Sequence, residues 1–246
     1  MREILRFQDV TLTYQAENGE VESLTDINFV VHKGELVSII GPSGCGKSTM
    51  LSLIAGLIKP TAGKIFIDGE EAQGNKTGYM LQKDNLLDWR TIRGNVRLGL
   101  EIREKLENTA YVDGLLKAYG LWEFRDKRPS QLSGGMRQRV ALIRTMATKP
   151  ELLLLDEAFS ALDYQTRLVV ADDVCKILRA EQKTAIIVTH DISEGISMAD
   201  RLIVLSKRPG RIKHDLQLTF QKTERRDDPA FREYFNMVWK ELDGNV

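Results

Sequence analysis

The sequence is poor in the features of secreted and membrane-spanning proteins. Its 246 residues include only two cysteines, Cys45 and Cys175, so a disulfide framework is not implied and a reducing compartment is expected. No apolar run approaches the roughly 20 residues that span a bilayer, and residues 1–4 lack the apolar segment of a signal peptide. These absences predict a cytoplasmic protein whose link to a membrane, if it has one, comes through a partner.

An excess of charge of one sign is also absent, because 35 basic residues are balanced by 35 acidic ones. Such a balance favours neither nucleic acid nor an anionic membrane surface as a partner, and we expect no nucleic-acid partner. The length and the apolar content of 42% fit one domain of good size, or one domain with a subdomain.

What the sequence does contain is a glycine-rich stretch at residues 41–49 that fits the phosphate-loop pattern G-x-x-x-x-G-K-[ST]. Glycines let the backbone form a concave nest of N–H groups, and the helix that follows points its positive end at the same anion. An apolar strand at residues 36–40 and a helix at 50–55 supply the required context. Lys47 can reach the β- and γ-phosphates, and the Ser48 hydroxyl can ligate Mg²⁺. We predict that nucleotide binds here, at Gly41, Ser43, Gly44, Cys45, Gly46, Lys47, Ser48 and Thr49.

Two further apolar strands end in titratable residues. Residues 152–155 are followed by Asp156 and Glu157, and residues 185–189 are followed by His190. Ligands of parallel sheets bind at the carboxyl ends of the strands. Asp156 is therefore expected to hold Mg²⁺, and Glu157 to accept a proton from an attacking water. The alternative, an acidic strand end facing solvent, fits poorly with a phosphate loop in the same chain.

The first part of the chain predicts a small antiparallel sheet beside the nucleotide core. Residues 7–14 alternate with a slip at Asp9, which indicates a bulged strand, and Asn18–Gly19 is typical of a hairpin turn. Further strands are expected at residues 24–31 and 65–69. Tyr14 is either an ordinary strand aromatic or a residue that stacks on a base.

The middle of the chain predicts a helical insert. Residues 78–82 indicate a strand that ends at Gln82, residues 83–99 a polar loop, and residues 101–119 a helix. Another helix runs from Met136 to Ala147 after Ser133, Gly134 and Gly135. This helix start suits an anion, although capping by Ser133 is the commoner reason for such a sequence. Beyond residue 205 the chain is charged and closes with an amphipathic helix that contains Tyr234, Met237, Val238 and Leu242.

Taken together, these residues resemble the ATP-binding cassette (ABC) ATPases. The resemblance extends from Tyr14 to about Arg211 and is most specific at Leu132–Gly135, the family's signature. It implies a single α/β domain with a P-loop NTPase (RecA-like) core, a small antiparallel β-subdomain and a helical subdomain. Residues 1–82 and 146–205 would form the nucleotide-binding core with the β-subdomain, residues 83–145 the helical subdomain, and residues 206–246 a C-terminal extension.

The resemblance also implies the cofactors, ATP and Mg²⁺, and a role for each site residue. Tyr14 would stack on adenine, and Ser48, Gln82 and Asp156 would lie at Mg²⁺. In hydrolysis, Glu157 would polarise the attacking water, which Gln82 senses, while Lys47 and His190 would contact the phosphates. The signature residues Ser133, Gly134 and Gly135 would reach ATP on a second copy of the chain, with Asp163 at the seam of a head-to-tail dimer.

Three stretches resemble one group within the family, the ATPase subunits of nitrate, taurine and alkanesulfonate importers: Asp84–Arg90, Met136–Arg139 and Arg208–Arg211. Two residues depart from the usual pattern, Met136 where the family mostly has Gln and Asp88 where the group more often has Pro. The implied function is to energise uptake of a small anion at the cytoplasmic face of the membrane. Transmembrane permease subunits and a solute-binding protein would be the partners. The alternatives are an exporter subunit and a non-transport ABC protein of DNA repair or translation.

Two further expectations follow from single residues. The phosphate nest favours a thiolate, so Cys45 should be more reactive than Cys175. Leu86, Leu87 and Trp89 stand in an otherwise polar loop. They either pack inward onto the helical insert or line a groove that receives a short helix of the permease.

Overall fold

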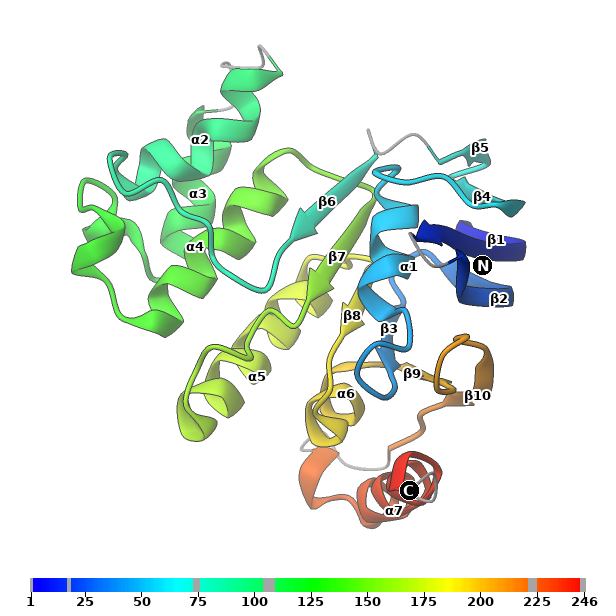
Figure 1. The fold of residues 1–246 in the computed structure, drawn as a ribbon. Helices are drawn as coiled ribbons and strands as arrows, with labels where there is room; N and C mark the ends of the chain where they lie inside the picture. Colours follow the sequence, from blue (N-terminus) through cyan, green and yellow to red (C-terminus); the bar gives the residue numbers. More distant parts are fainter. Residues whose placement is uncertain (1, 17–18, 73–75, 104–108, 221–224, 244–246) are drawn as a thin grey trace.

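Two sheets and the helices around them make up the computed structural model, which describes residues 2–16, 19–72, 76–103, 109–220 and 225–243 (Figure 1). The first sheet is antiparallel and has the strand order β2-β1-β4-β5. Its strands are β1 (Glu3–Ala16), β2 (Gly19–His32), β4 (Ala62–Ile67) and β5 (Glu70–Glu71). The second sheet has the order β10-β9-β3-β8-β7-β6. Its strands are β3 (Leu36–Ile40), β6 (Thr77–Met80), β7 (Leu152–Asp156), β8 (Ala185–Val188), β9 (Arg201–Leu205) and β10 (Ile212–Gln217).

Five neighbouring strands of the second sheet are parallel, and β10 pairs with β9 in the antiparallel sense. Strands β3, β7 and β8 are buried along their whole length. This agrees with their continuous apolar sequences, because a parallel sheet is covered on both faces. The carboxyl ends of these strands therefore meet at one edge, where the phosphate loop follows β3.

Helix α1 (Lys47–Ile54) lies between the two sheets, as Figure 1 shows. One core cluster joins Phe7 and Ile27 of the antiparallel sheet, Leu51 of α1, and Leu154 and Val188 of the parallel sheet. The expected bulge is confirmed, since Asp9 has φ 50° and the β1–β2 register shifts between Phe7 and Val10. The hairpin is confirmed too, although Asn18 of the expected turn lies outside the described residues.

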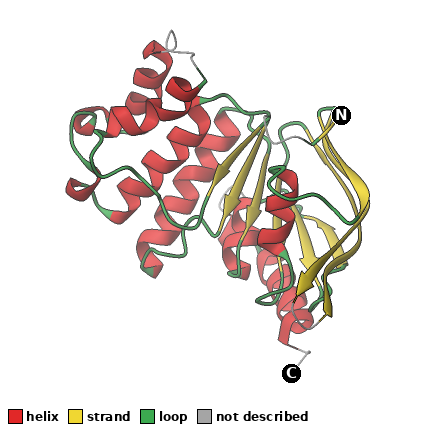
Figure 2. Ribbon diagram, turned by 45° about the horizontal axis from the view of Figure 1, so that its top comes forward, coloured by secondary structure: helices red, strands yellow, loops and turns green. Residues whose placement is uncertain are grey.

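The other face of the parallel sheet carries the helical region, seen as the group of helices beside the strands in Figure 2. It contains α2 (Ile92–Ile102), α3 (Thr109–Ala118), α4 (Gly134–Ala147) and two short 3₁₀ turns, η2 (Trp122–Phe124) and η3 (Pro129–Gln131). Helix α5 (Tyr164–Ala180) packs against α4 and contributes to the same core cluster.

The expected loop over residues 83–99 is wrong in its second half, because α2 begins at Ile92. The Thr91 side chain caps this helix by accepting a hydrogen bond from Gly94 N at 3.1 Å. Burial of Ile92, Val96 and Leu100 on one face stabilises it despite its two glycines. The single helix expected over residues 101–119 is instead the end of α2 and the whole of α3.

The C-terminal part completes the molecule. Helix α6 (Ile192–Met198) packs against the closing helix α7 (Pro229–Asp243), which follows the 3₁₀ turn η4 (Arg225–Asp227). The closing amphipathic helix is thus confirmed, whereas strand β10 was not expected. The fold class is confirmed; the boundaries at residues 82/83, 145/146 and 205/206 stay a prediction. In the described part of the chain, no helix is both long enough and apolar enough to cross a bilayer.

Candidate active site

The phosphate loop connects β3 to α1 and borders a hollow of about 530 Å³. Gly44 and Gly46 have φ angles of 74° and 106°, which a side chain would strain. The Lys47 ammonium group is turned back onto the loop, where it donates hydrogen bonds to Gly41 O at 2.7 Å and to Pro42 O at 3.0 Å. The residues around the hollow are Ser43, Gly44, Gly46, Lys47, Ser48, Thr49, Glu157, His190 and Arg208.

The surroundings of Cys45 do not favour the reactive thiolate expected from the sequence. Its side chain is 1% exposed, and burial raises the pKa of its thiol despite the nearby Lys47. The Sγ atom packs beneath the loop, where a Cβ on Gly41 would lie 2.8 Å from it. Cys45 therefore belongs to the core under the loop, and its backbone N–H group donates to Pro42 O at 3.3 Å.

Asp156 ends β7 beside the first turn of α1. Its carboxylate accepts hydrogen bonds from Ser48 Oγ at 3.1 Å and from Tyr79 Oη at 3.0 Å. Burial raises the pKa of Asp156, and these two donors oppose that rise. Ser48 and Asp156 bring oxygen atoms together, and oxygen is the ligand that Mg²⁺ prefers, so the donor set fits this ion.

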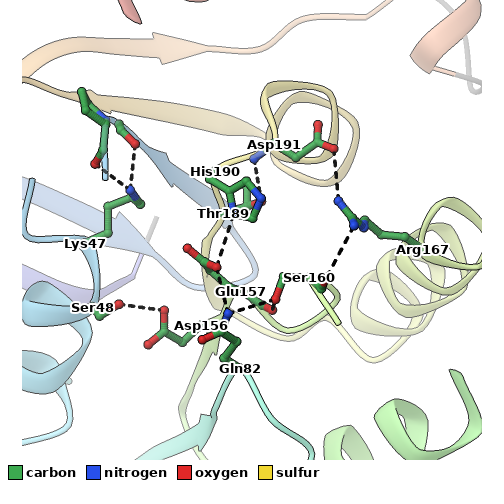
Figure 3. Close-up of polar contacts among 12 residues, drawn as sticks. Lys47, Ser48, Gln82, Asp156, Glu157, Ser160, Arg167, Thr189, His190 and Asp191 are labelled. Atoms are coloured by element: carbon green, nitrogen blue, oxygen red, sulfur yellow. Dashed lines mark hydrogen bonds and ion pairs between the residues drawn. The ribbon is translucent and has the colours of Figure 1, made fainter. Parts of the chain in front are cut away.

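Glu157 is the centre of a second group of polar side chains, drawn in Figure 3. One of its carboxylate oxygens lies 3.3 Å from Gln82 Nε2 and 3.3 Å from His190 Nδ1. The same Gln82 nitrogen is 3.3 Å from Ser160 Oγ. Three residues predicted from separate strand ends thus meet at one place, next to the phosphate-loop hollow.

The backbone explains how Glu157 reaches this position. Its φ angle of 45° is left-handed, and its N–H group donates to Val188 O of the neighbouring strand at 2.8 Å. Such a conformation costs a non-glycine residue about 1–3 kcal/mol and is held here by the surrounding sheet. The turn directs the carboxylate out of β7 toward Gln82 and His190 (Figure 3).

Glu194 carries a buried carboxyl group in the first turn of α6, the helix that follows His190. Asp191 caps α6 by accepting from Glu194 N at 3.1 Å, and it lies 3.7 Å from the Arg167 guanidinium (Figure 3). Burial raises the pKa of Glu194 to about 7. The carboxylates of Asp191 and Glu157 contribute to this rise, while Arg167 and a hydrogen bond with Thr189 oppose it.

The signature residues form a separate hollow of about 340 Å³, which has no wall residue in common with the phosphate-loop hollow. Ser133 caps α4 by accepting from Met136 N at 3.3 Å. A Cβ on Gly135 would lie 3.0 Å from Val170 Cγ2, so this glycine lets α4 approach α5 closely. Asp163 caps α5 through Thr166 N at 3.1 Å. In one chain, the signature and the phosphate loop are thus two distinct surfaces.

Tyr14 lies on β1, opposite Val21 of β2, and its side chain is 40% exposed. The same two strands approach the phosphate loop through Leu24, which pairs with Leu12 and would lie 2.6 Å from a Cβ on Gly46. Tyr14 is not among the residues that line the hollow. Its aromatic face is accessible, which suits either of the two interpretations given above.

Sequence reasoning missed three residues at this site. Tyr79 bonds Asp156, Arg167 pairs with Asp191, and Arg208 borders the hollow. Tyr79 lies on β6, the strand that leads to Gln82, and this position could have indicated that Tyr79 lies near the site. Arg167 and Arg208 reach the site from a helix and a loop. No local pattern marks Arg167, and the resemblance of Arg208–Arg211 to the importer group gave Arg208 no role at the site.

Comparison with known proteins agrees with this geometry. Residues 24–160 match the family described as ABC transporter. The ABC transporter ATP-binding protein YtlC of Bacillus subtilis is 45% identical over 97% of this chain and 95% of its own length. The taurine import ATP-binding protein TauB of Roseobacter denitrificans is 36% identical over 96% of this chain and 94% of its own.

A solved structure is similar as well. The post-hydrolysis dimer of the ATP-binding cassette MJ0796, bound to ADP and Pi, superposes with a TM-score of 0.74 at 32% identity. The match covers 88% of this chain and 99% of that one. The chain therefore belongs to the ABC transporter family, as one of its ATP-binding and ATP-hydrolysing subunits.

Proposed function

We propose that Glu157 is the residue that polarises the attacking water, with Gln82 and His190 beside it. The observation that carries this proposal is the convergence of these three side chains at the edge of the phosphate-loop hollow, where Gln82 and His190 each lie 3.3 Å from the same Glu157 carboxylate oxygen. Glu157 can accept a proton, Gln82 can orient the water, and His190 can contact the γ-phosphate. Ser48 and Asp156 would hold Mg²⁺, which neutralises charge on the phosphate oxygens.

The complete site requires a second copy of the chain. Ser133, Gly134 and Gly135 present a helix start with available N–H groups, but on a different surface from the phosphate loop. A head-to-tail dimer would bring this surface of one chain to the ATP held by the other, with Asp163 at the seam. The dimers reported for the cassette MJ0796 support this arrangement.

We further propose that the chain energises an importer for a small anion such as taurine, nitrate or an alkanesulfonate. The support is the similarity to TauB proteins at 36–39% identity. ATP would close the dimer and hydrolysis would reopen it, and permease subunits bound to the chain at the cytoplasmic face of the membrane would follow this cycle. A solute-binding protein would deliver the anion to the permease.

Growth of the host cell on defined sulfur and nitrogen sources tests this proposal. Replacement of the chromosomal copy by Glu157→Gln should abolish growth on one of the three anions while growth on sulfate and ammonium continues. Normal growth of the mutant on taurine, nitrate and alkanesulfonates alike would contradict the importer proposal. Purified protein would then show separately whether Mg²⁺-dependent ATP hydrolysis was lost.

A further inference from the structure

The segment between β9 and β10 is locked against the phosphate loop. Gly210 N donates to Ser23 O at 2.9 Å, and Thr25 N donates to Gly210 O at 3.0 Å, which fixes the segment to β2. On its other side, Gly210 approaches the loop so closely that a Cβ would lie 2.1 Å from Cys45 O. Only glycine fits in this gap, so the segment and the phosphate loop keep a fixed relation.

The same segment is also closed on itself. Ser206 N donates to Arg211 O at 2.9 Å, Arg211 N donates to Ser206 Oγ at 2.9 Å, and that hydroxyl lies 3.0 Å from Pro209 O. The backbone on both sides of Arg208 is therefore held in place. A side chain on such a support loses less conformational freedom on binding a ligand than one on an open loop.

Arg208 extends from this support to the wall of the phosphate-loop hollow. Arg208 is exposed, and its guanidinium makes no hydrogen bond or ion pair with any residue in the described part of the chain. Arg201 and Arg225 differ, because Arg201 pairs with Asp215 and Arg225 with Asp200. Arg211 of the same segment is exposed as well, but it does not line the hollow. An unpaired guanidinium beside a nest of N–H groups matches the geometry of phosphate oxygens, which it can bind through two parallel hydrogen bonds.

We propose that Arg208 is a phosphate-binding residue that acts on the nucleotide held by its own chain. The inference rests on the proposed function, since it requires nucleotide at the phosphate loop. Lys47 and the loop N–H groups bind from one side of the hollow, and Arg208 adds a second cation from the β9–β10 side. Its contribution is to nucleotide affinity and not to the bond-breaking step.

The test compares Arg208→Ala with Arg208→Lys and with the matched control Arg211→Ala. Arg211 is an exposed arginine of the same segment that does not line the hollow. We expect Arg208→Ala to weaken binding of MgADP by about tenfold, as for loss of a hydrogen bond to a charged group. Arg208→Lys should recover part of the loss, and Arg211→Ala should bind as the unmodified chain does. Pyrophosphate, which has neither base nor ribose, should also bind about tenfold more weakly to Arg208→Ala than to the unmodified chain. Its competition with MgADP measures this affinity.

Thermal unfolding separates this role from a structural one. Without nucleotide, the melting temperature of Arg208→Ala should equal that of the unmodified chain, while the increase on adding MgADP should be smaller. Equal affinity of the two proteins for MgADP would overturn the proposal, and so would a loss that leaves pyrophosphate binding unchanged. If the unmodified chain bound no nucleotide, the proposed function would fail and this inference with it. If all the variants bound MgADP as the unmodified chain does, the proposed role of Arg208 would be wrong, while the proposed function would stand.

Discussion

At the scale of single side chains, Glu157 gives the sharpest expectation. Glu157→Gln keeps the shape and the hydrogen bond to Gln82 but removes the proton acceptor. The hydrolysis rate should fall by about 10²–10⁴-fold while ATP binding remains. Steady-state phosphate release and equilibrium ATP binding measure the two effects. Glu151→Gln, an exposed glutamate just before β7, is the control. A Glu157→Gln protein that hydrolyses ATP at nearly the normal rate would show that another group activates the water.

Glu194 gives a prediction for the dependence of stability on pH. Its pKa of about 7 in the folded chain lies above the ordinary value of 4.5. The folded state therefore binds more protons than the unfolded state between these values, and the free energy of unfolding falls as the pH rises from 4.5 to 7. A shift of this size corresponds to a contribution on the order of 3 kcal/mol.

Glu194→Gln carries no proton to lose and should remove this contribution. Denaturant unfolding at pH 5 and pH 7.5 should show a smaller difference for the variant than for the unmodified chain. An equal difference in the two proteins would mean that Glu194 does not titrate in this range. Glu233→Gln, on the exposed side of α7, serves as a control for loss of one carboxylate.

Tyr14 is the residue for which two interpretations remain, and a substitution pair decides between them. Stacking on a base is worth roughly 1–3 kcal/mol. If Tyr14 stacks on adenine, Tyr14→Ala should weaken ATP binding by about tenfold or more, and Tyr14→Phe should have little effect. Titration with a fluorescent ATP analogue and competition by unlabelled ATP measure this. The same ATP affinity in all three proteins would mean that Tyr14 is an ordinary strand aromatic.

Most of the site could be predicted from the sequence because its residues stand at the ends of apolar strands. Asp156 is the last residue of β7, Glu157 follows it, and His190 stands two residues after the end of β8. The parallel sheet brings such strand ends together. The burial of Cys45 could not be predicted in this way. It depends on the close packing of Gly41 and Gly210. This packing brings together the phosphate loop, Leu24 of β2 and the segment from Leu205 to Gly210, which are distant from one another in the sequence.

At the scale of elements, the segment from Gln82 to α2 has a distinct surface. Leu86 is buried in the core of the helical region, so the inward-packing interpretation holds for this residue. Trp89 is 72% exposed. The segment is fixed to α2 and α4, because Asn95 Oδ1 accepts from Leu87 N at 2.7 Å and Arg144 donates to Asn85 O at 2.7 Å. A rigid segment with an exposed tryptophan suits a partner protein.

We therefore expect Trp89→Ala to leave the isolated chain folded and able to bind ATP, while it weakens assembly with the permease. Co-purification of the two proteins and solute uptake by cells are the measurements. Trp239→Ala, which removes an exposed tryptophan from α7, is the matched control. Normal assembly and uptake with Trp89→Ala would place the docking surface elsewhere on the chain.

The elements that could be predicted are those with a continuous apolar run, such as β3 and β7, or with a clear helical period of apolar residues, such as α4. Helix α2 was missed because Gly94 and Gly99 weaken its local preference, and its stability comes from burial against α4. Strand β10 was missed for a related reason. Its residues alternate between exposed and partly buried, and only pairing with β9 defines it as a strand.

At the scale of the whole molecule, the two hollows predict how activity depends on concentration. If hydrolysis needs the phosphate loop of one chain and Ser133–Gly135 of another, the rate per chain should rise with protein concentration until the dimer is saturated. Phosphate release measured over a wide range of concentrations tests this, with analytical ultracentrifugation in parallel. A rate per chain that stays constant while the protein sediments as a monomer would contradict the shared site.

The separation of these two hollows also bears on how a cell controls its energy use. If the site is shared as proposed, a solitary copy could keep ATP at its phosphate loop without breaking it down, since Ser133–Gly135 line a different hollow of the same polypeptide. Copies synthesised in excess of their membrane partners, and too dilute to meet one another, would then consume little ATP. Turnover would begin where two copies are held together, so the placement of Ser133–Gly135 would by itself confine ATP consumption to assembled transporters.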